Sequence, residues 1–160
     1  MSQTSIKTVA IIGQGYVGLP LAMAALSEGW RVIGIDTSES KVRQINAGES
    51  PVEDISNATL SQAVSSRKYL ASTDFQEVQN ASVVVLCVPT PLHQNKQPNI
   101  EILSDAAASV APFLSNGTLV ISESTSYPGT LREVIIPAVN AKKQSDVTNL
   151  YFACAPERIN

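Results

Sequence analysis

The sequence predicts an α/β protein with a Rossmann-type, doubly wound parallel sheet of about six strands and helices on both faces. Short, unbroken apolar runs alternate with amphipathic stretches, and such runs are typical of parallel strands that are covered on both faces. Strands that alternate with helices imply right-handed crossovers. Six strands fit the order 3-2-1-4-5-6, and a glycine-rich turn follows the first of them.

The apolar runs define the expected strands. They are Thr8–Ile12, Arg31–Ile35, Tyr69–Ala71, Ser82–Val88, Thr118–Ser122 and Leu150–Ala155. Helices are expected between them at Val17–Glu28, from Ser38 to Asn46, and at Thr59–Ser66, Ile100–Leu114 and Gly129–Asn140. Pro137 is expected to disturb the end of the last helix, because proline lacks the backbone N–H that a helix uses.

Length and composition limit the possible classes of protein. A chain of 160 residues is expected to form one domain, residues 1–160. Its net charge of −3 does not fit a nucleic-acid partner. The apolar stretches are too short to cross a membrane, and the first residues do not resemble a signal peptide, so the expected location is the cytoplasm. Cys87 and Cys154 form no disulfide or metal pattern.

The pattern G-x-G-x-x-G falls at Gly13, Gly15 and Gly18, between an expected strand and an expected helix. In this context the pattern predicts a dinucleotide site. Gly13 permits a tight turn, Gly15 lets a diphosphate approach the backbone, and Gly18 lets the helix pack closely on the strand. Tyr16 and Val17 lie in the same turn and are candidate cofactor contacts. The alternative is a glycine-rich turn that binds no ligand.

Asp36 ends the second expected strand, 18 residues after Gly18. A carboxylate at this place accepts hydrogen bonds from the ribose hydroxyls of NAD and repels the 2′-phosphate of NADP, so the predicted cofactor is NAD. Lys41 lies one turn into the next helix, within reach of the ribose or the adenine edge. The alternatives are that Asp36 caps that helix and that Lys41 is merely solvated.

Polar residues follow the later strands, where ligands bind to sheets of this kind. Pro89 and Thr90 follow the fourth strand, and Thr125 follows the fifth. Glu157 and Arg158 follow the sixth, as a carboxylate and a guanidinium suited to proton transfer and to phosphate or sugar recognition. The alternatives are a rigid proline turn, hydroxyls that cap a helix, and a surface ion pair.

Four segments together resemble the UDP-glucose/GDP-mannose dehydrogenase family. They are GQGYVGLPLA from Gly13, CVPTPL from Cys87, EST and PGT between Glu123 and Thr130, and PERIN from Pro156. The details are most similar to bacterial enzymes that act on UDP-N-acetylhexosamines, such as UDP-N-acetylmannosamine. The resemblance implies that a UDP-sugar is oxidised at C6, from alcohol to carboxylate, by two NAD in sequence.

The resemblance also implies roles for single residues. Val17, Asp36, Lys41, Thr90 and Thr125 would contact NAD. Thr125 and Glu157 would also position a water or move protons, and Glu157, Arg158 and Ile159 would contact the nucleotide sugar. Gln14 departs from the family, which usually has an aliphatic residue there, and Ala155 stands where serine is common. We expect neither to alter the cofactor turn, because the glycines remain.

The same resemblance implies that the chain is truncated. The catalytic cysteine of the family, its linking helix and its UDP-binding C-terminal domain have no counterpart before Asn160, and neither cysteine of this chain matches the catalytic one. We therefore expect the chain alone to be inactive and the full-length protein to be a homodimer or larger. No metal is expected. The alternative function is a stand-alone NAD-binding or redox-sensing module without catalysis.

Overall fold

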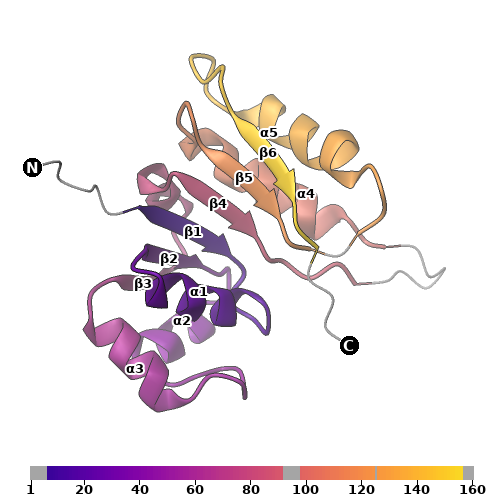
Figure 1. Ribbon diagram of the computed structural model, residues 1–160. Helices are drawn as coiled ribbons and strands as arrows, with labels where there is room; N and C mark the ends of the chain where they lie inside the picture. The colour runs from indigo at the N-terminus through magenta and orange to yellow at the C-terminus, as the bar shows by residue number, and fades with distance from the viewer. Residues whose placement is uncertain (1–6, 92–97, 125, 157–160) are drawn as a thin grey trace, which may run out of the picture.

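In the part of the chain that the structure describes, six parallel strands form one sheet in the order β3-β2-β1-β4-β5-β6 (Figure 1). The computed structural model describes residues 7–91, 98–124 and 126–156. The strands are β1 (Thr8–Ile12), β2 (Arg31–Ile35), β3 (Tyr69–Ser72), β4 (Val83–Leu86), β5 (Leu119–Ser122) and β6 (Tyr151–Cys154). The predicted fold class and strand order are confirmed.

Strand β4 is shorter than the predicted Ser82–Val88, and the reason lies in its neighbour. Leu86 pairs with Ile12, the last residue of β1. On its other side Leu86 pairs with Ser122, the last residue of β5, and the chain turns away from β1 at Gly13, so pairing on both sides of β4 ends at Leu86. β6 is likewise shorter than predicted, because it pairs with β5 only from Tyr151 to Cys154.

Among the described residues, five α-helices connect the strands. They are α1 (Gly18–Ser27), α2 (Glu39–Asn46), α3 (Asn57–Ser65), α4 (Glu101–Val110) and α5 (Ile136–Lys142). The same residues also form the shorter helical segments η1 (Phe75–Asn80), η2 (Ala111–Phe113) and η3 (Leu131–Ile135). The segment η1 was not predicted, and the predicted helix Ile100–Leu114 changes from α to 3-10 geometry at Ala111.

The prediction that Pro137 disturbs the end of the last helix is wrong. The segment η3 is a π-helical turn, and it places Pro137 in the first turn of α5. A proline there removes no needed donor, since the first N–H groups of an α-helix have no partner within it. The helix therefore continues to Lys142.

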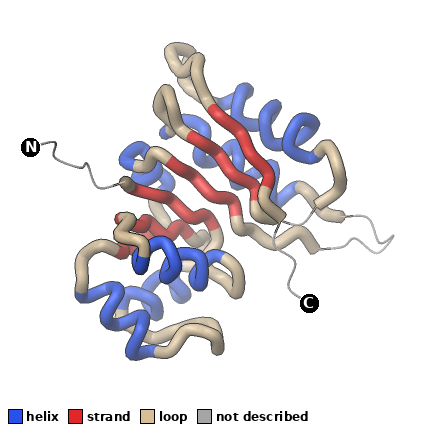
Figure 2. Tube along the Cα trace, viewed as in Figure 1, coloured by secondary structure: helices blue, strands red, loops and turns tan. Residues whose placement is uncertain are grey.

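Helices cover both faces of the sheet and bury a separate apolar core on each (Figure 2). Alternate residues of β1 enter different cores. Ala10 and Ile12 pack with residues of α4 and α5, whereas Val9 and Ile11 pack with residues of α1, α2 and α3. No helix in the described residues is long and apolar enough to cross a membrane.

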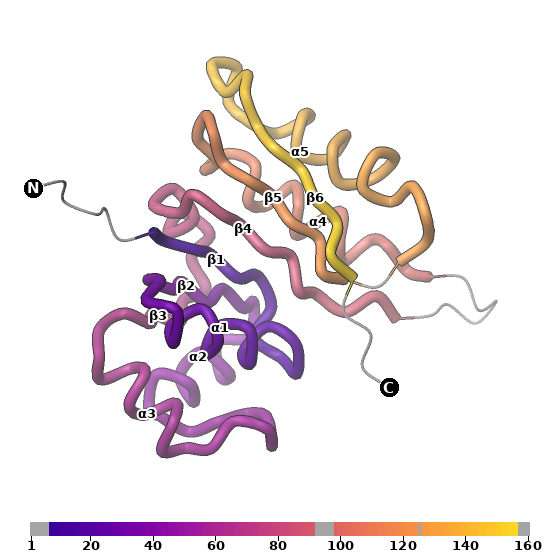
Figure 3. The backbone as a smooth tube through the Cα atoms, viewed as in Figure 1, coloured from indigo at the N-terminus to yellow at the C-terminus, as the bar shows by residue number. Residues whose placement is uncertain are grey.

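The carboxyl ends of the strands lie at one edge of the sheet, because all six run in the same direction. Figure 3 shows the chain leaving β1, β4 and β5 at this edge. The predicted glycine turn and the two later loops are therefore neighbours, although they lie far apart in the sequence. β1 and β4 are adjacent, and the strand order reverses between them. A crevice at that point is the usual ligand site of such sheets.

Candidate functional site

The three glycines of the turn have different surroundings. Gly13 has a φ of +96°, and a Cβ atom added to it would lie 2.5 Å from the carbonyl oxygen of Cys87. A Cβ atom added to Gly18 would lie 1.8 Å from the carbonyl oxygen of Gly13. A Cβ atom added to Gly15 would meet no atom within 4 Å. Gly13 and Gly18 are thus required by the protein's own backbone, whereas Gly15 leaves space next to the turn.

The amino-terminal end of α1 lacks a side-chain cap. Its N-cap residue, Val17, makes no capping hydrogen bond. In contrast, the hydroxyls of Ser38 and Ser56 accept hydrogen bonds from Lys41 N and Thr59 N, and so cap α2 and α3. The open space at Gly15 therefore lies at the positive end of α1, where Val17 supplies no side-chain cap. A helix end of this kind attracts an anion such as a diphosphate.

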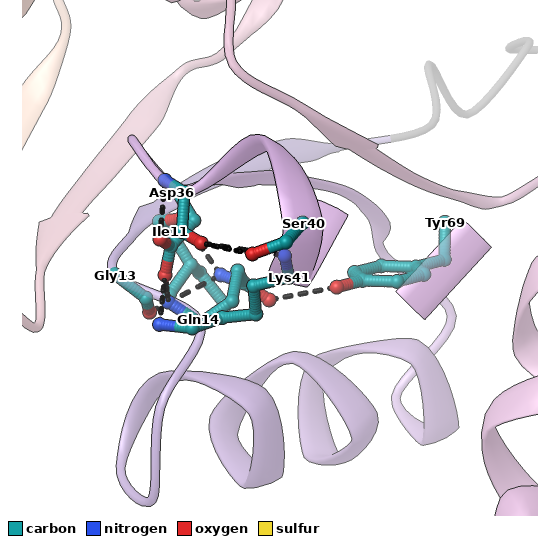
Figure 4. A network of polar contacts seen from close by, with 8 residues as sticks. Ile11, Gly13, Gln14, Asp36, Ser40, Lys41 and Tyr69 are labelled. Carbon is teal, nitrogen blue, oxygen red and sulfur yellow. Dashed lines mark hydrogen bonds and ion pairs between the residues drawn. The ribbon is translucent and has the colours of Figure 1, made fainter. Parts of the chain in front are cut away.

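Asp36 lies at the end of β2 and is only 8% exposed. Its Oδ2 accepts hydrogen bonds from the backbone N–H of Gln14 at 2.9 Å and from Lys41 Nζ at 2.7 Å (Figure 4). Its Oδ1 accepts from the N–H of Ser38 at 3.0 Å. Burial raises the pKa of Asp36, but these hydrogen bonds and the charge of Lys41 outweigh burial, so the pKa is lowered. The carboxylate is ionised at neutral pH.

Both alternatives for this pair are wrong. Asp36 does not cap α2, because the hydroxyl of Ser38 does so. Lys41 is not merely solvated, because its ammonium forms an ion pair with Asp36 and its side chain is 32% exposed. The structure thus brings Lys41 to the carboxylate that is predicted to hold the ribose.

Two cavities meet at Asp36. One has a volume of about 390 Å³ and lies along the glycine turn and the ends of β4 and β5. The other, of about 540 Å³, also has Asp36 in its wall and is further lined by Phe75, Ile102 and Asp105. Both cavities include Gly13, Lys41 and Pro89 in their walls. Together they form a crevice whose two parts share the Asp36 carboxylate as a wall.

Most of the predicted cofactor contacts line this crevice. The cavity along the glycine turn is lined by Gly13, Gly15, Tyr16, Val17, Asp36, Lys41, Pro89 and Thr90. Gly18 lies beneath the turn and is buried. The predicted catalytic and substrate residues, which are Thr125, Glu157, Arg158 and Ile159, lie outside the described residues.

Five residues that line the same cavity were not predicted as site residues, namely Gln14, Cys87, Val88, Glu123 and Ser124. Burial and the nearby Glu123 raise the pKa of the Cys87 thiol to about 12, so this cysteine stays protonated. Ser124 Oγ donates to the carbonyl oxygen of Val88 at 2.7 Å and thereby joins the loops after β4 and β5. This hydroxyl caps no helix. Its place just after an apolar strand was the signal in the sequence that could have identified it as a residue of the site.

Known proteins resemble the chain over almost its whole length. It is 33% identical over 159 residues to a UDP-N-acetyl-D-mannosamine dehydrogenase of Methanococcus maripaludis, a match that covers 96% of this chain and 35% of the relative. It is 33% identical over 153 residues to a UDP-N-acetyl-D-glucosamine 6-dehydrogenase of Pseudomonas aeruginosa, covering 95% and 35%. The structure of a UDP-D-ManNAc dehydrogenase from Pyrococcus horikoshii superposes with a TM-score of 0.84 at 30% identity, covering 96% and 37%.

The chain spans about a third of the length of these relatives. Residues 7–160 match the family model described as the UDP-glucose/GDP-mannose dehydrogenase family, NAD binding domain. The uncapped helix, the open space at Gly15 and the ionised Asp36 fit that cofactor. The chain therefore belongs to the UDP-glucose/GDP-mannose dehydrogenase family, of which it is the NAD-binding domain.

Proposed function

We propose that this chain supplies the NAD site of an enzyme that oxidises the C6 alcohol of a UDP-N-acetylhexosamine to a carboxylate, using two NAD. The names of the relatives support this substrate class, since they include dehydrogenases of UDP-N-acetylmannosamine and UDP-N-acetylglucosamine. The observation that carries the proposal is the ionised Asp36 beside an open glycine turn.

The described residues would hold NAD along the whole crevice. The backbone of the glycine turn and the positive end of α1 would bind the diphosphate next to Gly15. Asp36 would accept hydrogen bonds from the adenosine ribose, and the cavity bounded by Phe75 and Ile102 would receive the adenine. Thr90 and Pro89 would lie along the nicotinamide half. When bound, NAD supplies the hydride acceptor for the oxidation.

Lys41 must share Asp36 with the ribose. Its ammonium donates to the same oxygen, Oδ2, that accepts from Gln14 N. Oδ1 accepts one hydrogen bond from Ser38 N and retains capacity for a hydroxyl. The 2′-phosphate of NADP would bring further negative charge to a buried carboxylate, so we expect NAD to bind more tightly.

Calorimetric titration of the 160-residue chain with NAD and NADP tests the proposal. We expect NAD to bind at least tenfold more tightly than NADP, a difference of about 1.4 kcal/mol. The variant Asp36→Asn should lose much of this preference, because it keeps the shape of the side chain but removes its charge. Equal affinities of the wild type for the two dinucleotides would contradict the role given to Asp36.

Activity needs a separate measurement. We expect no steady formation of NADH when UDP-N-acetylhexosamine and NAD are added to this chain alone, and turnover when the full-length protein is used. The same assay distinguishes the alternative of a redox-sensing module, which would show no turnover in either case. The roles of Thr125, Glu157, Arg158 and Ile159, the cytoplasmic location and a homodimer or larger assembly stay predictions.

A further inference from the structure

Gln14 occupies the position between the first two glycines of the cofactor turn, and its side chain is fully buried. Its Nε2 donates to the carbonyl oxygens of Ile11 at 2.9 Å and Gly13 at 3.3 Å. Its Oε1 accepts a hydrogen bond of 2.7 Å from the hydroxyl of Tyr69. Figure 4 shows the amide between the turn and the tyrosine ring. A buried amide with donors and acceptor all paired has one well-defined orientation.

The space for this amide comes from Gly34 in β2. A Cβ atom added to Gly34 would lie 2.6 Å from Cδ and Oε1 of Gln14 and 2.8 Å from the Tyr69 hydroxyl. Tyr69 itself is 4% exposed and belongs to β3, the edge strand next to β2. Burial and the charge of Asp36 raise the pKa of Tyr69, so it keeps its proton and remains a donor. The turn after β1 is thus tied across β2 to a strand two places away.

Gln14 also contacts Asp36, the carboxylate that is proposed to bind the ribose of the cofactor. The backbone N–H of Gln14 donates to Asp36 Oδ2 at 2.9 Å, while its side-chain Oε1 accepts the hydrogen bond from Tyr69. Movement of the side chain would therefore turn the N–H that holds the carboxylate. We propose that Gln14, fixed by Tyr69, is a positioning residue that holds Asp36 in the orientation that receives the adenosine ribose. This inference rests on the proposed NAD site.

The test is a double-mutant cycle on cofactor preference with the variants Gln14→Met, Tyr69→Phe and their combination. For each, the affinities for NAD and NADP are measured by calorimetry at a temperature where circular dichroism shows a folded chain. We expect each single variant to lower the preference for NAD over NADP at least threefold. Because both act through one hydrogen bond, the combination should lower it no further than the more affected single variant does.

The readout separates positioning from stability. A residue that serves stability alone would lower the unfolding temperature and leave the ratio of the two affinities unchanged. The matched control is Tyr151→Phe, since Tyr151 is 55% exposed on β6, at the opposite edge of the sheet. It should keep the wild-type ratio. If a single variant does not fold, the combined variant is measured alone, because it leaves neither polar partner buried without the other.

Two outcomes overturn the inference: a wild-type ratio of affinities in Tyr69→Phe or in the combined variant, and single effects that add in the combination. Failure of the proposed function has a different signature, because the wild-type chain would then show no preference for NAD at all.

Discussion

Two alanine substitutions in the same turn should separate stability from NAD binding, since Gly18→Ala should lower the stability and Gly15→Ala the affinity for NAD. A Cβ atom at Gly18 would lie 1.8 Å from a backbone oxygen, so the helix or the turn must move. Overpacking of this kind costs about 2–3 kcal/mol. For a domain of this size the unfolding temperature of Gly18→Ala should fall by about 5–10 °C.

Gly15→Ala should leave the unfolding temperature close to that of the wild type. Its added Cβ atom meets nothing within 4 Å, and no positive φ opposes a side chain there. A substitution without a clash changes the free energy of unfolding by less than about 0.5 kcal/mol. The Cβ atom would, however, enter the space assigned to the diphosphate, and we expect the affinity for NAD to fall about tenfold or more, which is about 1.4 kcal/mol.

Thermal unfolding with and without NAD measures both effects. A ligand at one hundred times its Kd stabilises the folded state by about 2.7 kcal/mol, so the wild type should show a clear upward shift in unfolding temperature. Gly15→Ala should show the wild-type temperature without NAD and little shift at the same NAD concentration. The reasoning is refuted if Gly15→Ala responds to NAD as the wild type does, or if Gly18→Ala is as stable as the wild type.

Three further predictions concern single side chains. Ser122 Oγ is buried and has no hydrogen-bond partner in the described structure, whereas Ser124 Oγ donates to backbone carbonyls. Urea unfolding should therefore show that Ser122→Ala is at least as stable as the wild type, and that Ser124→Ala is about 1 kcal/mol less stable. At pH 8 an alkylating reagent should label the exposed Cys154 long before Cys87, whose pKa of about 12 leaves few thiolates, and equal labelling by mass spectrometry would contradict this. The pKa of Asp36 is lowered, so the contribution of its ionised form to stability is complete above the ordinary pKa of 3.8 and is lost as the pH falls through the lowered pKa. The difference in the free energy of unfolding between the wild type and Asp36→Asn should therefore become smaller in acid. A constant difference from pH 7 to pH 2 would contradict this prediction.

The fold was predictable because the strands are continuous apolar runs. Thr8–Ile12 and Arg31–Ile35 end as predicted, since glycine and aspartate follow them directly. The ends of β4 were not predictable from its own residues, because they depend on where β1 stops pairing. The π turn before Pro137 was missed for a similar reason, since hydrophobic periodicity does not separate π from α geometry.

The cofactor site was predictable as far as its backbone motif and its charged residue. The burial of Gln14 was not, because a single polar residue in a turn does not reveal which way it points. A signal was nevertheless present in β2, where Gly34 interrupts an apolar run. A glycine within a strand often marks close approach by another group, and here that group is the amide of Gln14.

The absence of a side-chain cap on α1 links the cofactor to local order. Ser38 and Ser56 cap α2 and α3 from within the chain, whereas no side chain caps α1, and bound NAD would place an anion at the positive end of that helix. Bound NAD would thus act as a structural part of α1, and hydrogen exchange of the amides at its start should slow more on binding than exchange elsewhere in the helix.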